Sequence, residues 1–119
     1  MIDPRTHTAR RGEALVAAYL EARGATILGR NVRIGRDEID LVARQGSLLL
    51  FVEVRTRRTA RFGPPAASID AAKRERVRRA ARRLLASGRF GRGPVRLDAA
   101  GVVLAAGEAP VLSYHPAAL

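Results

Sequence analysis

Two apolar segments separated by a short glycine-containing turn constrain the fold of this chain more than any other feature. The segments span residues 39–43 and 48–54, and Gln45-Gly46-Ser47 lies between them. Apolar runs of this length around such a turn are typical of a β-hairpin. Because the second run is apolar at nearly every position, we expect its strand to be covered on both faces. The sequence therefore predicts a core built around this strand.

Each of the two segments also carries a carboxylate, Asp40 in the first and Glu53 in the second. A carboxylate inside a buried strand is costly unless a cation pairs with it. Since alternate side chains of a strand share a face, Glu38 lies with Asp40, and Glu53 lies with Arg55. If Asp40 and Glu53 face each other across the hairpin, their hard oxygen ligands suit Mg²⁺ or Mn²⁺. The hairpin therefore predicts a divalent metal site.

The residues before the hairpin predict one helix and two short strands. We expect disorder over residues 1–8, a helix over 9–23, and strand segments at 25–28 and 32–34. The apolar positions at helical spacing are Leu15, Ala18, Tyr19 and Ala22. Glu13 lies at the flank of this apolar face. It is either an active-site acid or a solvated acid near the positive N-terminus of the helix.

The residues after the hairpin predict a mobile loop over 56–67 and a second helix over 71–86. We consider two interpretations of this loop: its arginines bind phosphates, or the loop is a solvated connection without a binding role. Asp70 is expected to cap the helix and Gly88 to end it. Its apolar stripe comprises Val77, Ala80, Ala81, Leu84 and Leu85. Its opposite side carries Arg74, Arg76, Arg78, Arg79, Arg82 and Arg83. Lys73 lies at the head of the stripe, where it meets a carboxylate or extends to water.

The remaining chain predicts strands at 95–99, 101–105 and 111–114, the first of them with one polar face. The element order is then a helix, three strands, a helix and two or three strands. This order indicates an α/β fold with a central mixed β-sheet flanked by helices, in three layers at most. A length of 119 residues is typical of one domain with a single core.

Composition excludes several classes of protein. The chain has no cysteine, which excludes thiolate chemistry and disulfides and agrees with a cytoplasmic location. No apolar run approaches the ~18 residues of a membrane span. The first eleven residues lack the apolar core of a signal peptide.

A net charge of +11, from 22 basic and 11 acidic residues, indicates an anionic partner, nucleic acid first of all. The alternative is a general surface charge, because 21 of the basic residues are arginines and a GC-rich genome favours arginine codons. Lys73 is the single lysine. The few aromatic residues argue against a module that stacks on bases. They are Tyr19, Phe51, Phe62, Phe90 and Tyr114.

Several motifs together resemble a known family. The motifs are Arg11-Gly12-Glu13, Glu38-Ile39-Asp40-Leu41-Val42-Ala43, Phe51-Val52-Glu53-Val54-Arg55 and Phe62-Gly63. In this order, over residues 9–99, they resemble the YraN-type bacterial proteins. Asp40, Glu53 and Arg55, with Glu13 on an earlier helix, are also similar to the PD-(D/E)XK signature of restriction-endonuclease-like nucleases. The resemblance implies that fold and a distant relation to archaeal Holliday-junction resolvases, which are dimers.

The resemblance also implies roles for individual residues. Asp40, Glu53 and the backbone carbonyl of Val54 would bind Mg²⁺ or Mn²⁺, and Glu13 would hold a metal-bound water or a second ion. The wider signature has lysine at the position of Arg55. Arginine stays protonated and cannot act as a general base, although it can pair with a phosphate. Lys73 is then the candidate for supplying the missing ammonium group.

Two functions remain open from the sequence, with a weaker third. The first is a metal-dependent nuclease acting on branched or otherwise structured DNA. The second is a non-catalytic nucleic-acid-binding protein of the same fold. The third is a module that docks on an acidic protein or on ribosomal RNA. The residues expected to contact nucleic acid are Arg55, Arg57, Arg58, Arg61 and Arg74. A homodimer follows only from the resemblance to the resolvases.

Overall fold

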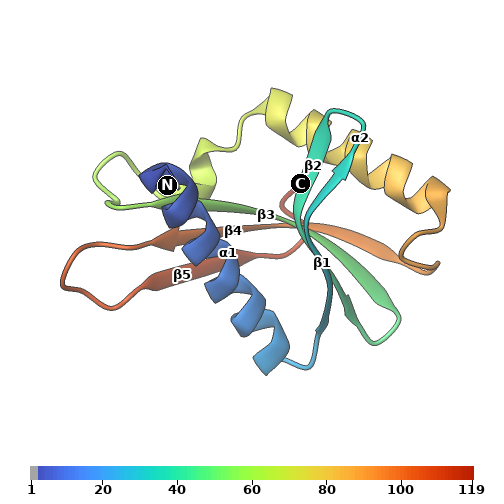
Figure 1. Ribbon diagram of the computed structural model, residues 1–119, viewed down its shortest axis with the longest axis horizontal. Helices are drawn as coiled ribbons and strands as arrows, with labels where there is room; N and C mark the ends of the chain where they lie inside the picture. Colours follow the sequence, from blue (N-terminus) through green and yellow to red (C-terminus); the bar gives the residue numbers. More distant parts are fainter. Residues whose placement is uncertain (1–2) are drawn as a thin grey trace.

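The computed structural model describes residues 3–119, which form a five-stranded mixed sheet and two α-helices (Figure 1). In chain order the elements are α1 (Pro4–Ala22), β1 (Thr26–Ile34), β2 (Asp37–Gln45), β3 (Leu48–Arg57), the 3-10 helix η1 (Pro65–Ser68), α2 (Ala71–Ser87), β4 (Val95–Val103) and β5 (Val111–His115). The strands follow one another across the sheet in sequence order. β3 and β4 are parallel, and the other neighbouring strands are antiparallel. The α/β class and the mixed sheet are as predicted.

The predicted hairpin is formed by β2 and β3. Their register runs from Gln45↔Leu48 to Leu41↔Val52, and the turn contains Gly46 with a φ of 60°. A positive φ is accessible to glycine without steric cost, so this residue favours the tight turn. β3 is the central strand of the sheet, and six consecutive residues of it, 49–54, are buried. The prediction of a doubly covered strand is therefore confirmed.

The two helices cover opposite faces of the sheet. Leu50, Val52 and Val54 of β3 pack in one apolar cluster with α1, whereas Leu49 and Phe51 pack in a second cluster with α2. Because these residues alternate along one strand, the two clusters lie on opposite faces. Figure 1 shows α1 crossing the strands and α2 lying beyond the β1–β2 hairpin. The predicted three-layer arrangement is confirmed.

α1 differs from its prediction in both its start and its buried face. Asp3 caps it by accepting a hydrogen bond from the Arg5 N–H, and Pro4 is its first residue. Proline is favoured there because its missing N–H would be unpaired anyway. Residues 4–8, expected to be disordered, are therefore helical; Met1 and Ile2 lie outside the described residues. The buried residues are Gly12, Val16, Ala17 and Leu20; of the predicted face, Leu15 and Tyr19 pack at the edge of the core, whereas Ala18 and Ala22 are exposed.

This shift of the buried face changes the position of Glu13. Val16 and Ala17 follow Glu13 by three and four residues, so Glu13 lies on the buried side of α1 instead of at its flank. The sequence prediction was wrong because alanine and tyrosine fit either a half-exposed or a buried position. Sequence alone therefore could not distinguish the two faces.

Three boundaries also differ from prediction. β1 is one strand with an irregularity in its pairing between Ile27 and Gly29, where two short strands were expected. β4 is likewise a single strand that includes Gly101, where a Cβ atom would lie only 3.0 Å from Ser113 Oγ of β5 and 3.2 Å from the Ala66 nitrogen of η1. β3 continues to Arg57 and η1 begins at Pro65, so the predicted 56–67 loop is restricted to residues 58–64.

α2 follows its prediction closely. The Asp70 side chain accepts a hydrogen bond from the Lys73 N–H, and Gly88 ends the helix with a φ of 70°. Val77, Ala80, Ala81 and Leu84 are buried as expected. Arg79, expected on the exposed side, instead donates two hydrogen bonds of 2.7 Å to buried Asp37 at the start of β2. Neither described α-helix is long and apolar enough to cross a membrane.

Candidate active site

Asp40 and Glu53 meet on the central hairpin. The regular pairing of β2 with β3 ends at Leu41↔Val52, and beyond it the Asp40 Oδ2 atom accepts a hydrogen bond of 2.8 Å from the Val54 N–H. Asp40 and Glu53 lie close enough for the charge of Asp40 to raise the pKa of Glu53. Asp40 therefore replaces a main-chain acceptor of the ladder beside Glu53.

A local break in strand alternation accompanies Asp40. Ile39 packs in the α2 cluster and Leu41 in the α1 cluster, although residues two apart in a regular strand share a face. On β1, Asn31 lies between the partners of Ile39 and Leu41 and has a φ of 48°. Asparagine adopts this left-handed conformation more readily than most residues. The irregular backbone at Asn31 thus coincides with the strand break at Asp40.

Two cations approach Glu53. The Lys73 Nζ atom lies 3.5 Å from Glu53 Oε2, and the Arg55 Nε atom lies 3.8 Å from the same oxygen. Glu53 is buried, whereas the Lys73 and Arg55 side chains are about one quarter exposed. Lys73 lies in the first turn of α2, and the Asp70 cap fixes where this helix begins. Of the two positions that the sequence allowed for Lys73, the structure shows the one in which it pairs with a carboxylate.

The protonation of both acids is shifted by their surroundings. Burial is the main cause that raises the pKa of Glu53 to about 8, and the nearby charge of Asp40 acts in the same direction. Lys73 and Arg55 oppose this shift of the pKa. Burial also raises the pKa of Asp40, against the hydrogen bond from the Val54 N–H. Both shifts favour the protonated acids, so a divalent cation that binds here has to compete with a proton.

The unpaired oxygen of Glu53 tests whether the site fits a metal ion. Glu53 Oε1 is buried and has no hydrogen-bond donor, which is unusual for a buried carboxylate. It is available to a divalent cation, and Asp40 supplies a second oxygen next to it. Among residues 3–119 no three acidic, histidine or cysteine side chains gather closely enough to surround an ion. The two carboxylates on the hairpin are hard oxygen ligands of the kind that Mg²⁺ and Mn²⁺ accept, as is the Val54 carbonyl that the family resemblance implies.

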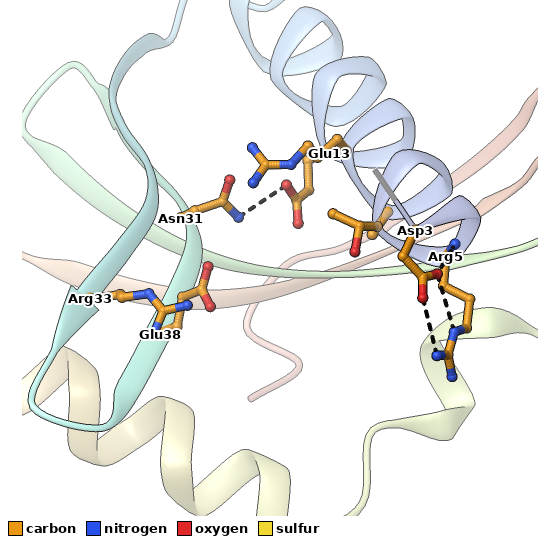
Figure 2. A pocket seen from close by; sticks show the side chains of 9 residues that line it. Asp3, Arg5, Glu13, Asn31, Arg33 and Glu38 are labelled. Carbon is orange, nitrogen blue, oxygen red and sulfur yellow. Dashed lines mark hydrogen bonds and ion pairs between the residues drawn. The ribbon is translucent and has the colours of Figure 1, made fainter. Parts of the chain in front are cut away.

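Glu13 lies beside the acid pair in an adjoining cleft of about 750 Å³. Figure 2 shows its carboxylate turned toward Asn31, whose amide nitrogen donates a 3.0 Å hydrogen bond to Glu13 Oε1. Burial is the main cause that raises the pKa of Glu13, and the charges of Asp40 and Glu38 contribute. The cleft lies between the first turns of α1 and the β1–β2 hairpin. Its arginines are Arg5, Arg10 and Arg33.

Of the five arginines predicted to contact nucleic acid, Arg55, Arg57 and Arg58 line one hollow, and Arg61 and Arg74 lie outside it. Arg55 lies against Glu53, as described above. Arg57 and Arg58 are exposed at the end of β3 and donate to the Ser68 and Thr8 hydroxyl oxygens, respectively. Arg61 lies over the Phe62 ring in the following loop. Arg74 is exposed on α2 and borders a separate hollow with Pro64 and Leu119.

Another buried acid, Asp98, was missed by the sequence analysis, which assigned it to the polar face of a strand. Asp98 is fully buried and accepts hydrogen bonds from Arg96 Nε (2.8 Å) and Nη2 (2.9 Å), the Tyr114 hydroxyl (2.6 Å) and the Ala117 N–H (2.8 Å). Burial, followed by the bond to Asp98, raises the pKa of Tyr114. The network ties β5 and the C-terminus to β4. The spacing of Arg96 and Asp98 on one strand face was the available sequence signal.

Comparison with known proteins gives consistent matches. A sequence model of the family described as "Uncharacterised protein family UPF0102" matches residues 12–102. A UPF0102 protein of Sorangium cellulosum is 46% identical over 114 residues, which are 92% of this chain and 78% of the relative. One of Streptomyces coelicolor is 45% identical over 107 residues, covering 88% and 82%. One of Leifsonia xyli is 40% identical over 107 residues, covering 90% and 91%.

Proposed function

This chain belongs to the UPF0102 family, the YraN-type proteins, and we propose that it is a metal-dependent nuclease acting on branched or otherwise structured DNA. We also propose that its mixed sheet belongs to the restriction-endonuclease-like class. One observation carries the proposal: buried Glu53 and half-buried Asp40 lie close together on neighbouring strands, and one oxygen of Glu53 has no hydrogen-bond partner. A purely structural acid would be paired as Asp98 is.

The metal ligands of the proposal are Asp40, Glu53 and the Val54 carbonyl. When bound, Mg²⁺ or Mn²⁺ would polarise the phosphate and lower the pKa of a coordinated water. Glu13, fixed by Asn31, faces the cleft from the other side and would orient water there or bind a second ion. The raised pKa of Glu53 means that the ion has to displace a proton, so metal binding is expected to strengthen as pH rises toward 8.

Lys73 and Arg55 supply the positive charge. Lys73 lies 3.5 Å from Glu53, which suits an ammonium that pairs with a phosphate oxygen or steadies a water next to the acids. Arg55 remains protonated and would neutralise developing charge on the phosphate. We therefore assign to Lys73, from α2, the ammonium that related nucleases carry at the position of Arg55.

A cleavage assay tests the proposal. A panel of labelled four-way junctions, flaps, single strands, duplexes and structured RNAs is incubated with the protein in Mg²⁺ or Mn²⁺. We expect metal-dependent cutting of at least one branched DNA, and a loss of at least a hundredfold in Glu53→Gln. Lys73→Ala should lose at least tenfold. Glu108→Gln and Arg92→Ala, which change exposed residues of connecting loops, should cut normally. Cutting by Glu53→Gln at the rate of the unmodified protein would contradict the proposal, because it would not depend on the acid pair.

A non-catalytic nucleic-acid-binding role is the alternative, and Arg55 is the observation that favours it. Arginine at this position cannot exchange a proton with water, and Lys73 reaches Glu53 only from a different element. Binding of branched DNA in the same panel, without cutting in either metal, would support this alternative. It would also contradict the nuclease proposal.

A further inference from the structure

Phe62 is exposed to an extent that packing does not explain. Its side chain is 89% exposed, compared with 64% for Val111 and 38% for Leu28, the other exposed large apolar residues described. Isolated apolar residues on a surface are common, but a fully exposed aromatic ring is less so. The sequence analysis argued against base stacking because aromatic residues are few. The structure places one of these few entirely in solvent.

The loop that carries Phe62 is held in a defined shape. The Gly63 N–H donates to the Ala60 carbonyl (3.0 Å), which closes a β-turn with Arg61 and Phe62 at its centre. The Arg61 N–H donates to the Thr59 hydroxyl (3.1 Å), and Gly63 has a φ of 103°. Only glycine adopts this φ readily, so the turn depends on it. Phe62 is thus presented at the tip of a hydrogen-bonded turn.

The surroundings of the ring are strongly cationic. The Arg61 guanidinium lies 5.6 Å from the centre of the Phe62 ring, and exposed Arg57 and Arg58 lie at the end of β3 and at the start of the loop. Residues 54–69 contain four arginines and no acid. An exposed aromatic ring next to arginines is a combination that suits nucleic acid. The ring stacks on a base while the guanidinium groups bind the flanking phosphates.

The loop is also connected directly to the acid pair. β3 leads from Glu53 to Arg57 over about 13 Å at ~3.3 Å per residue, and the loop begins at residue 58. At the far side of the loop, η1 leads into the first turn of α2, which carries Lys73. A strand of nucleic acid lying along the C-terminal end of β3 and the following loop would therefore contact both the arginines and the acids.

We propose that Phe62 stacks on an unpaired base and so directs the protein to branched or single-stranded nucleic acid. In a duplex the faces of the bases are covered by their neighbours, so an exposed ring has nothing to stack on. At a branch or in a single strand a base face is free. This inference rests on the proposed function, because it presumes a nucleic-acid substrate at the adjoining acids.

The chain has no tryptophan, so Phe62→Trp introduces a single fluorescent reporter at the tip of the loop. The test uses the full chain carrying Glu53→Gln, in EDTA, so that binding is measured without cutting. The probes are a labelled four-way junction, a single strand of twelve nucleotides and a fully paired duplex. Phe62→Ala measures the loss of the ring. Val111→Trp and Val111→Ala on β5 are matched controls at another exposed apolar residue.

We expect Phe62→Ala to weaken binding of the junction and the single strand about tenfold. Duplex binding should change less than twofold. Phe62→Trp should retain affinity, and its fluorescence should be quenched by the single strand but not by the duplex. The Val111 variants should bind like the unmodified protein, without quenching.

Equal losses on all three probes, no loss, or quenching by the duplex would overturn the inference. So would self-association in sedimentation experiments that Phe62→Ala abolishes, because the ring would then belong to a protein interface. If Phe62→Ala binds normally while the parent protein cuts DNA, only this inference fails. If no probe binds at low salt, the proposed function fails as well.

Discussion

Glu53 and Asp98 are both buried acids, on the two adjacent strands β3 and β4, yet their surroundings differ. Asp98 accepts four hydrogen bonds, so its burial is compensated. Glu53 has ion contacts at 3.5 and 3.8 Å to one oxygen and no donor to the other. A carboxylate buried in this way reduces stability whenever it is ionised. The proposed metal site would therefore lose stability in exchange for a free ligand, which is common at functional positions.

The burial of the Glu53 carboxylate predicts how stability depends on pH. The pKa of Glu53 is about 8 in the folded chain and near its ordinary value of 4.5 in the unfolded chain. Between these values the folded state binds a proton that the unfolded state has released. Stability without metal should therefore be greatest below pH 4.5 as far as this group is concerned, and decline as pH rises to about 8. A decline of about 2–4 kcal/mol is expected.

Urea unfolding in EDTA between pH 5 and 9 measures this dependence. Glu53→Gln should be less sensitive to pH over this range and more stable than the unmodified chain at pH 9. Glu108→Gln, which changes an exposed acid in a turn, should retain the original profile. An identical decline in Glu53→Gln and in the unmodified chain would assign the effect to other groups.

The contact between α1 and β3 shows how an element positions the site. Gly12 packs against Thr56 so closely that a Cβ atom at Gly12 would collide with Thr56 Oγ1 and lie 2.9 Å from Thr56 Cβ. Glu13 is the next residue of the helix, so its distance from the acid pair depends on this close approach. Glycine in the middle of a helix costs about 1 kcal/mol relative to alanine, which indicates that the packing requires it.

We therefore expect Gly12→Ala to destabilise the chain by about 1–3 kcal/mol, despite the better helix propensity of alanine. The double variant with Thr56→Ala should recover part of this loss, because it removes the Oγ1 and Cγ2 atoms that the new methyl group would meet. The free energies of unfolding of both single variants and the double variant form the required cycle. A neutral or stabilising Gly12→Ala would show that α1 does not approach β3 this closely.

The elements differ in how far the sequence could predict them. The β2–β3 hairpin and α2 were predicted well because a glycine turn, an Asp cap and a glycine stop are local signals. The buried face of α1 was wrong, because its small side chains fit two faces equally and the sheet decides between them. The division of β1 and of β4 into shorter strands was also wrong. In β1 the segment 29–31 was expected to separate two strands, although Gly29 marks an irregular position within one strand, and in β4 a new strand was expected to begin at the crowded Gly101.

At the scale of the whole molecule, the candidate site combines side chains from four separate segments, namely the β2–β3 hairpin, α2, β1 and α1. Asp40 and Glu53 could be paired from sequence because one hairpin carries both. Lys73 arrives by the connection from β3 through α2 to the parallel strand β4, so its contact depends on how the helix lies on the sheet. Asn31, which fixes Glu13, gave no sequence signal, since its role comes from a positive φ opposite Asp40. The hairpin therefore supplies the acid pair, and long-range packing brings the other side chains of the site to it.

Titration calorimetry with Mn²⁺ at pH 7.5 tests the central claim, that Asp40 and Glu53 meet in order to hold a divalent ion. We predict saturable binding by the unmodified protein, at least tenfold weaker binding by Asp40→Asn and by Glu53→Gln, and unchanged binding by Glu108→Gln. Circular dichroism would show that each variant is folded. No saturable binding by the unmodified protein, or unchanged affinity in both acid variants, would contradict the claim.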